Sequence, residues 1–148
     1  MSKVAYNSEG YMHILSLKIE GPPVASSRPR VAKNGGVWDT KAKQKKEIIR
    51  CLKQQLEVEG IVDCGLRVNL YFYFSLPKYL QKKSKDSLIY HTKKPDLDNL
   101  SKTYLDALTG LVWKDDAQVV HLNVWKGYGE HARTEIEIER MDYGRFRA

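Results

Sequence analysis

The sequence predicts an α/β (α+β) fold, with a single domain in which two main helices pack on a mixed β-sheet. Strand-like apolar segments alternate along the chain with two segments whose apolar residues recur at helical spacing. The 148 residues, 42% of them hydrophobic, suit one globular domain with a real core. Since no repeat or low-complexity linker divides residues 1–148, they are treated as one unit, with 1–10 and 141–148 expected as flexible ends.

The N-terminal half is expected to hold one strand and one helix. Residues 11–20 alternate loosely between apolar and polar side chains, as a strand does. A turn-rich segment follows over 22–40, with a short extended piece at 37–38. A helix is predicted over 41–59, and Gly60 is placed to stop it. The apolar side chains that define this helix are Ile48, Ile49, Leu52 and Leu56.

The C-terminal half is expected to hold three strands and the second helix. Residues 66–76 are rich in aliphatic and aromatic side chains, which predicts a central strand. The second helix is predicted over 97–109, and two further strands over 118–127 and 132–140. These last two strands are expected to form a hairpin around 127–129. The apolar stripe of the helix consists of Leu97, Leu100, Tyr104, Leu108 and Leu111.

Acidic residues are concentrated in one short part of a basic chain. Lys and Arg outnumber Asp and Glu by 25 to 18, giving a formal charge of +7, which suits nucleic acid, an anionic membrane or a merely basic soluble protein. A positive surface would attract phosphates, while clustered acids could hold the cation that lets water attack one. Together the two features indicate a nuclease. The clustered acids are Asp96, Asp98, Asp106, Asp115 and Asp116.

Asp96 and Asp98 are separated by one residue. In extended backbone, side chains two residues apart point to the same side, so both carboxylates could bind one cation if the helix begins near Asp98. Pro95 favours an extended approach, because it biases Lys94 away from helix. The alternative is helix capping, since Asp is favoured at helix starts.

Asp98, Lys102 and Asp106 lie at four-residue steps, on the helix face away from the apolar stripe. The Lys102 ammonium could therefore lie beside a scissile phosphate and stabilise its developing charge. Asp106, a second turn away, is expected to be a supporting partner. The alternative is a surface row of ion pairs contributing about 0.2–0.5 kcal/mol each.

Asp115 and Asp116 precede the third predicted strand. Adjacent strand residues face opposite ways, so one of the two is expected to reach the metal, and the residues alone do not decide which. Mg²⁺, with Mn²⁺ as a substitute, takes oxygen ligands and keeps several waters, so two or three carboxylates plus phosphate oxygens suffice.

The sequence KPDLDNLSKTYLDALTG, followed by DDAQVV, closely resembles the signature of RusA-type Holliday-junction resolvases, endodeoxyribonucleases often found in prophages. The resemblance is tight over 93–121 and looser towards the N-terminus. It implies a RusA-like fold and Mg²⁺-dependent cleavage of branched DNA, the four-way junction of recombination and repair, by a homodimer making two symmetric nicks. The residues it implies are the metal ligands Asp96, Asp98 and Asp116 and the essential Lys102. Asn99 and Asp106 are expected to support these residues without contacting the metal.

Two basic segments are expected to bind DNA. The lysine-rich loop over 77–94 leads straight into the acidic motif and is predicted to follow the phosphate backbone; the alternative is a solvated loop. Phe74, Tyr79 or Tyr90 could wedge into the junction centre. The predicted DNA-binding residues are Arg28, Arg30, Lys33, Lys82, Lys83, Lys85, Lys93 and Lys94.

Other classes of site receive no support from the sequence. The four histidines lack zinc-ligand spacing, and His91 is expected on an exposed loop rather than as a proton shuttle. No GxxxxGK[ST] motif occurs, so no nucleotide cofactor is expected. No apolar run approaches the ~20 residues of a transmembrane helix, and no membrane partner is expected. Two unpaired cysteines favour a reduced, cytoplasmic protein.

The function predicted from these residues is a Mg²⁺-dependent endonuclease that resolves Holliday junctions. One alternative is a non-catalytic basic DNA-binding module, whose acids only cap a helix. The other is a metal-dependent nuclease that acts on other branched or flap substrates.

Overall fold

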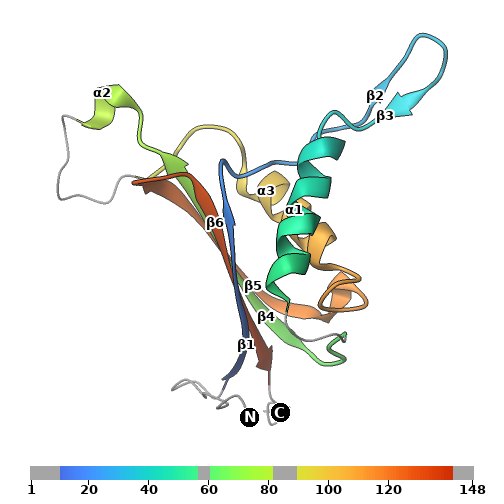
Figure 1. Ribbon diagram of the computed structural model, residues 1–148, viewed down its shortest axis with the longest axis vertical. Coiled ribbons are helices and arrows are strands. Elements are labelled where there is room, and N and C mark those ends of the chain that lie inside the picture. Colours follow the sequence, from blue (N-terminus) through green and yellow to red (C-terminus); the bar gives the residue numbers. More distant parts are fainter. Residues whose placement is uncertain (1–10, 57–60, 82–89, 142–148) are drawn as a thin grey trace, which may run out of the picture.

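The computed structural model describes residues 11–56, 61–81 and 90–141, and a four-stranded sheet with the order β1-β6-β4-β5 forms its centre (Figure 1). Strands β1 and β6, and strands β6 and β4, pair antiparallel, whereas β4 and β5 pair parallel. The sheet is therefore mixed, and the predicted fold class is confirmed. The strands are β1 (Tyr11–Glu20), β4 (Leu66–Ser75), β5 (Val119–Gly129) and β6 (Arg133–Met141).

Strands β5 and β6 follow one another in the chain but do not pair. Strand β4 lies between them, so that Tyr71 is opposite Trp125 on one side and Glu135 on the other. The predicted hairpin around 127–129 is therefore wrong, and the connection falls at 130–132. The cause is the burial of β4, because a buried strand needs hydrogen-bond partners along both edges. Its fully buried side chains are Leu66, Val68, Leu70 and Phe72.

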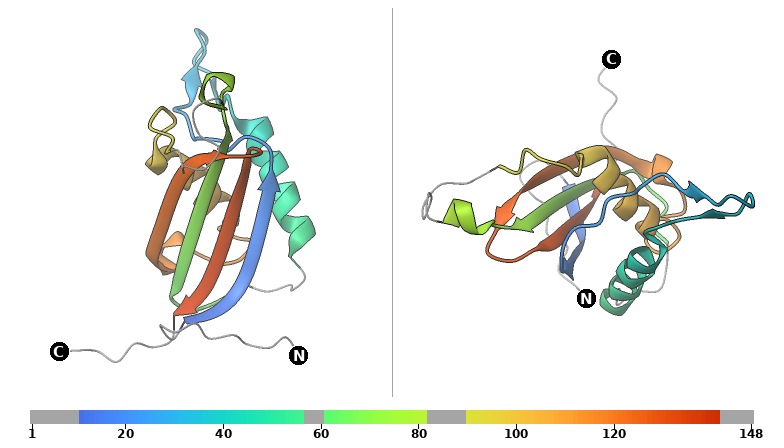
Figure 2. Two further views of the ribbon diagram at one scale, coloured as in Figure 1. Left: turned by 90° about the vertical axis from the view of Figure 1, so that its left-hand side faces the viewer. Right: turned by 90° about the horizontal axis from the view of Figure 1, so that it is seen from above.

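Helices α1 (Ala42–Gln55) and α3 (Leu97–Leu108) lie together on one face of the sheet (Figure 2). Helix α1 ends before the predicted residue 59, and 57–60 lie outside the described residues. Helix α3 ends one residue before its predicted end, and Gly110 follows with a φ of 88°, a conformation that glycine adopts without strain. None of the described helices is long and apolar enough to cross a bilayer. The buried hydrophobic side chains of the two helices are Ile48, Leu52, Leu100, Tyr104, Ala107 and Leu108.

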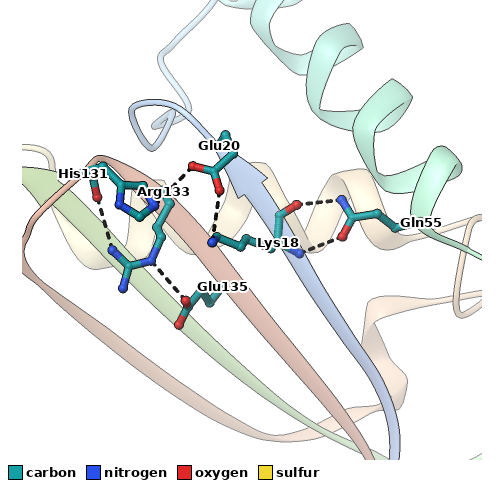
Figure 3. A network of polar contacts seen from close by, with 6 residues as sticks. All are labelled: Lys18, Glu20, Gln55, His131, Arg133 and Glu135. Carbon is teal, nitrogen blue, oxygen red and sulfur yellow. Dashed lines mark hydrogen bonds and ion pairs between the residues drawn. The ribbon is translucent and has the colours of Figure 1, made fainter.

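The C-terminal end of α1 is fixed to the edge of the sheet. The Gln55 side chain accepts a hydrogen bond from the Lys18 amide at 2.8 Å and donates one to the Lys18 carbonyl at 2.6 Å (Figure 3). It thus satisfies backbone groups on the free edge of β1. On the same strand, the Lys18 ammonium lies 3.1 Å from the Glu20 carboxylate. Helix α1 is therefore held against β1 by polar contacts as well as by its apolar face.

Two of the short elements that the sequence did not predict lie in its expected loops. In the turn-rich segment, β2 (Arg30–Val31) pairs with β3 (Val37–Trp38). The extended backbone of β3 was predicted, but β2 and the pairing were not. This hairpin projects from the body of the molecule (Figure 1). In the predicted loop over 77–94, α2 (Lys78–Gln81) forms a single turn, because the Pro77 carbonyl accepts hydrogen bonds from two amides of that turn. One turn is too short to show helical periodicity in the sequence.

Candidate functional site

Helix α3 presents the charged row that its sequence predicted. Asp98, Lys102 and Asp106 are all exposed, and all three line one hollow of about 560 Å³. Other side chains of α3, two apolar side chains of β5 and the carboxylate-bearing Asp116 complete its lining. The fold therefore brings Asp116, from the segment before β5, to the same hollow as the row on α3.

Asp96 stands at the start of α3. Its backbone is extended, with φ −74° and ψ 151°, and its side chain makes no capping hydrogen bond to the described helix. The helix begins at Leu97, so the extended approach that the sequence required is present. Asp98 accepts a hydrogen bond from the Asn99 amide at 2.9 Å. Capping thus does not account for Asp96, although Asp98 does interact with the first turn.

The adjacent acids Asp115 and Asp116 have different surroundings. Asp115 caps the short 3₁₀ helix η1 (Asp116–Gln118) and accepts a hydrogen bond from the Ala117 amide at 2.9 Å. Gln118 accepts hydrogen bonds from the amides of Lys114 and Asp115, which completes a capping box. The Ala117 amide, and then a hydrogen bond with Asp116, lower the pKa of the Asp115 carboxyl. Asp115 is thus engaged with backbone, whereas Asp116 lines the hollow.

The residues fit a hard cation without forming a complete cage. Within 11–56, 61–81 and 90–141, no three His, Cys, Asp or Glu side chains are grouped so that they could hold a metal ion. The convergence predicted for Asp96, Asp98 and Asp116 is therefore not formed, and Asp96 does not line the hollow. Exposed carboxylates suit Mg²⁺, which commonly binds one or two of them together with phosphate oxygens and waters. The ligand roles of these acids stay predictions.

A second hollow, of about 510 Å³, adjoins Asp98 and Lys102. The segment that forms its other wall is held to α3, because the Ser26 amide donates to the Asn99 carbonyl at 3.0 Å and the Ser26 hydroxyl lies 2.9 Å from that of Thr103. Asn99 thus supports this wall through its backbone. The residues that line the hollow are Ser26, Ser27, Arg28, Pro29, Asp98, Asn99 and Lys102.

The predicted DNA-binding residues fall into three groups. Arg28 lies in the second hollow, whereas Arg30 and Lys33 lie farther out on the β2–β3 hairpin and its turn. The Lys93 ammonium donates a hydrogen bond to the Tyr79 hydroxyl at 3.1 Å, and this contact raises the pKa of Lys93. Lys94 is exposed. The remaining lysines, which lie outside the described residues, are Lys82, Lys83 and Lys85.

Lys126 is a residue of this region that sequence reasoning missed. From β5, its ammonium donates hydrogen bonds to the Lys93 carbonyl at 2.7 Å and the Pro95 carbonyl at 2.8 Å. It thereby fixes the chain that leads into Asp96 and α3. A lone lysine on a strand carries no sequence signal for such a contact, because the carbonyls it binds become neighbours only in the fold.

His91 is buried, and its predicted exposure is wrong. Its side chain, 8% exposed, stacks against Phe74 with ring centroids 4.2 Å apart and lies near Tyr128 at 5.0 Å. Burial, and then the nearby charge of Lys126, lower its pKa. The aromatic rings that enclose it come from the ends of β4 and β5, which the sequence did not place together. Phe74 is thereby occupied, whereas Tyr79 and Tyr90 remain exposed.

Comparisons with known proteins agree with the motif. The sequence model of the family described as Endodeoxyribonuclease RusA matches residues 20–139. A Bacillus subtilis (strain 168) protein, named as the uncharacterized protein YqaN, is 34% identical over 140 residues, covering 88% of this chain and 99% of that protein. A Lactococcus phage r1t protein, named crossover junction endodeoxyribonuclease rusA, is 36% identical over 96 residues, covering 61% of this chain and 70% of that protein.

Proposed function

Because the chain belongs to the RusA endodeoxyribonuclease family, we propose that it is a metal-dependent DNA endonuclease that resolves Holliday junctions by paired symmetric nicks, in recombination and repair. The phage relative named as a crossover junction endodeoxyribonuclease supports this substrate. The observation that carries the proposal is that Asp98, Lys102 and Asp116 line one hollow of a chain with formal charge +7.

The side chains around the hollow have distinct roles in this proposal. When bound, Mg²⁺ or Mn²⁺ would polarise the scissile phosphate and lower the pKa of a bound water. Asp98 and Asp116 would hold the ion together with phosphate oxygens, and Asp96, at the start of α3, would join them in the DNA complex. Lys102 would donate to a non-bridging phosphate oxygen and stabilise its negative charge. Asp106, in the same hollow, would help to orient the Lys102 ammonium.

DNA binding is assigned to the basic residues that adjoin these hollows. Arg28 would contact the phosphate next to the one beside Lys102, because both side chains line the second hollow. Arg30 and Lys33 would contact a junction arm, and Lys94 with the lysines of the 77–94 segment would follow the phosphate backbone. A homodimer suits two paired cuts, since the four-way junction is itself two-fold symmetric.

The proposal is tested with Asp98→Asn on a labelled mobile four-way junction. We expect Mg²⁺-dependent nicking to fall about 10²-fold or more, because a ligand charge is lost. Binding in EDTA should be unchanged or tighter, since one negative charge facing phosphate is removed. Asp63→Asn, an exposed acid outside both hollows, is the matched control and should nick normally.

Each alternative function has its own outcome in this assay. Nicking by Asp98→Asn at the wild-type rate would remove Asp98 from the site. Junction binding by the wild type without nicking in Mg²⁺ would favour the non-catalytic DNA-binding module. Equal cleavage of the junction, of a flap and of linear duplex would favour a nuclease without junction selectivity.

A further inference from the structure

The β2–β3 hairpin exposes large apolar side chains that do not belong to the hydrophobic core. It forms a separate two-stranded sheet, in which Arg30 pairs with Trp38 and Val31 pairs with Val37. Val31 is 67% exposed, Val37 66% and Trp38 48%, and the hairpin extends beyond the helices into solvent (Figure 1). Val31 and Val37 share one face of this ribbon and Trp38 lies on the other, because adjacent strand residues face opposite ways. Exposed apolar groups on a projecting element mark a contact surface more often than a structural need.

The charges around this apolar group are almost all positive. Within residues 21–40 the cations are Arg28, Arg30 and Lys33, and the one acid is Asp39. The Asp39 carboxylate is already engaged by the Lys45 ammonium at 2.7 Å and by a backbone amide. Exposed apolar side chains beside cations complement nucleic acid, whose bases present apolar faces between phosphates.

The hairpin begins at the candidate site. Arg28 and Pro29, directly before β2, line the hollow that also contains Asp98 and Lys102. From Arg28 to Val31 is three residues, at most ~10 Å at ~3.3 Å per residue. This reach corresponds to about three base steps along a strand. A DNA strand whose phosphate lies beside Lys102 would therefore pass the apolar side chains of the hairpin within a few nucleotides of the cut.

We propose that the β2–β3 hairpin is a wedge that inserts Val31, Val37 and Trp38 against unstacked bases at the branch point. The inference rests on the proposed function and adds how branched DNA is distinguished from duplex. Insertion into a regular duplex must first unstack paired bases, whereas bases at a branch point are already less well stacked. The turn that joins the strands is fixed by a hydrogen bond from the Gly36 amide to the Asn34 side chain at 3.1 Å, so the wedge is presented by a defined turn.

The test measures DNA binding by the full-length chain in EDTA, with 2-aminopurine placed at the branch point of a four-way junction. The variants are Trp38→Ala, and Val31→Ser combined with Val37→Ser. Ile61→Ser, which removes another exposed apolar side chain, is the control. We expect wild type and control to raise the 2-aminopurine fluorescence. Both hairpin variants should lack this rise in fluorescence. Their ratio of junction affinity to duplex affinity should be roughly tenfold lower than that of the wild type, with little change in duplex affinity itself.

The outcomes separate the wedge from the function on which it rests. If the wild type binds and nicks junctions while both hairpin variants keep its fluorescence and selectivity, the wedge is wrong and the nuclease stands. If the wild type neither binds nor nicks junctions, both proposals fail. If the hairpin variants change the oligomeric state without DNA, in sedimentation experiments, the surface joins copies of the chain and the wedge is wrong. Thermal melting checks that each variant is folded.

Discussion

Replacing Lys126 by Met tests whether the ammonium on β5 holds the start of α3. The side chain keeps its length but loses both hydrogen bonds, to the Lys93 and Pro95 carbonyls. A hydrogen bond from a charged donor contributes about 1.5–3 kcal/mol. The hydrogen bond to the Lys93 carbonyl is exposed, so water can replace it and its contribution is neglected. The hydrogen bond to the Pro95 carbonyl is partly buried, so its loss should lower the local stability of this segment by ~2 kcal/mol. Since 1.4 kcal/mol is tenfold, local opening of this segment should become about 30-fold more frequent.

Hydrogen exchange of the Leu100 amide reports this opening. That amide donates to the Asp96 carbonyl at 3.1 Å, in the first turn of α3. In Lys126→Met we expect its exchange to be about 30-fold faster, while amides of the central strand β4 change much less. Lys126→Arg should restore part of the protection. Lys53→Met, on α1, removes the same charge and is the matched control, because its side chain has no partner among the described residues.

Junction cleavage is the second measurement on the same variants. If the fixed approach to Asp96 orients the site, Lys126→Met should lower the nicking rate at saturating DNA more than it lowers affinity. If the exchange rate of the Leu100 amide stays within threefold of the wild type and cleavage is also unchanged, Lys126 does not hold the start of α3.

Two further predictions concern stability. Tyr104→Phe should lower the free energy of unfolding, measured in urea, by ~2 kcal/mol, because the Val24 amide and the buried Thr134 hydroxyl both lose their hydrogen-bond partner. The control, Tyr71→Phe, should change this free energy by less than ~0.5 kcal/mol, since the Tyr71 hydroxyl has no hydrogen bond within the described part of the chain. The lowered pKa of His91 means that the unfolded chain takes up a proton near pH 6.5 while the folded chain does not, so stability should fall from pH 7.5 to 5.5. His91→Phe should abolish that part of the fall, and equal falls in both proteins would contradict the assignment.

Local patterns predicted the elements whose structure depends on local rules. The steps of three and four in the second helix gave α3 to within one residue, because one apolar stripe has to face the sheet. The same steps placed Asp98, Lys102 and Asp106 on the opposite face, where they are found. Strand β4 was recognised as central from its apolar content alone.

Pairing between strands could not be read from the sequence in the same way. Strands β5 and β6 are adjacent in the chain and separated by a turn, which favoured a hairpin. What separates them is the demand of β4 for partners on both edges, a property of a distant segment. The burial of His91 depends on the same long-range arrangement, since its stacking partner Phe74 lies at the end of β4.

The candidate site was predicted in part. Spacing alone could not separate Asp115 from Asp116, because the boundary between turn and strand was unknown. Hydrogen bonds of the capping box now distinguish their surroundings. The positions of Arg28 and Lys102 around a common hollow also required the fold, since 73 residues lie between them in the chain.

The capping box at η1 has a consequence for how neighbouring positions tolerate mutation. Ser, Thr and Asn can replace Asp at the start of a helix with little loss, since each offers an oxygen to the same amide. Residue 115 should therefore accept any of these side chains with the turn preserved. Residue 116 has no such freedom if its carboxylate acts on DNA. Mutational scanning with a cleavage readout should therefore find that position 115 tolerates substitution and that position 116 does not.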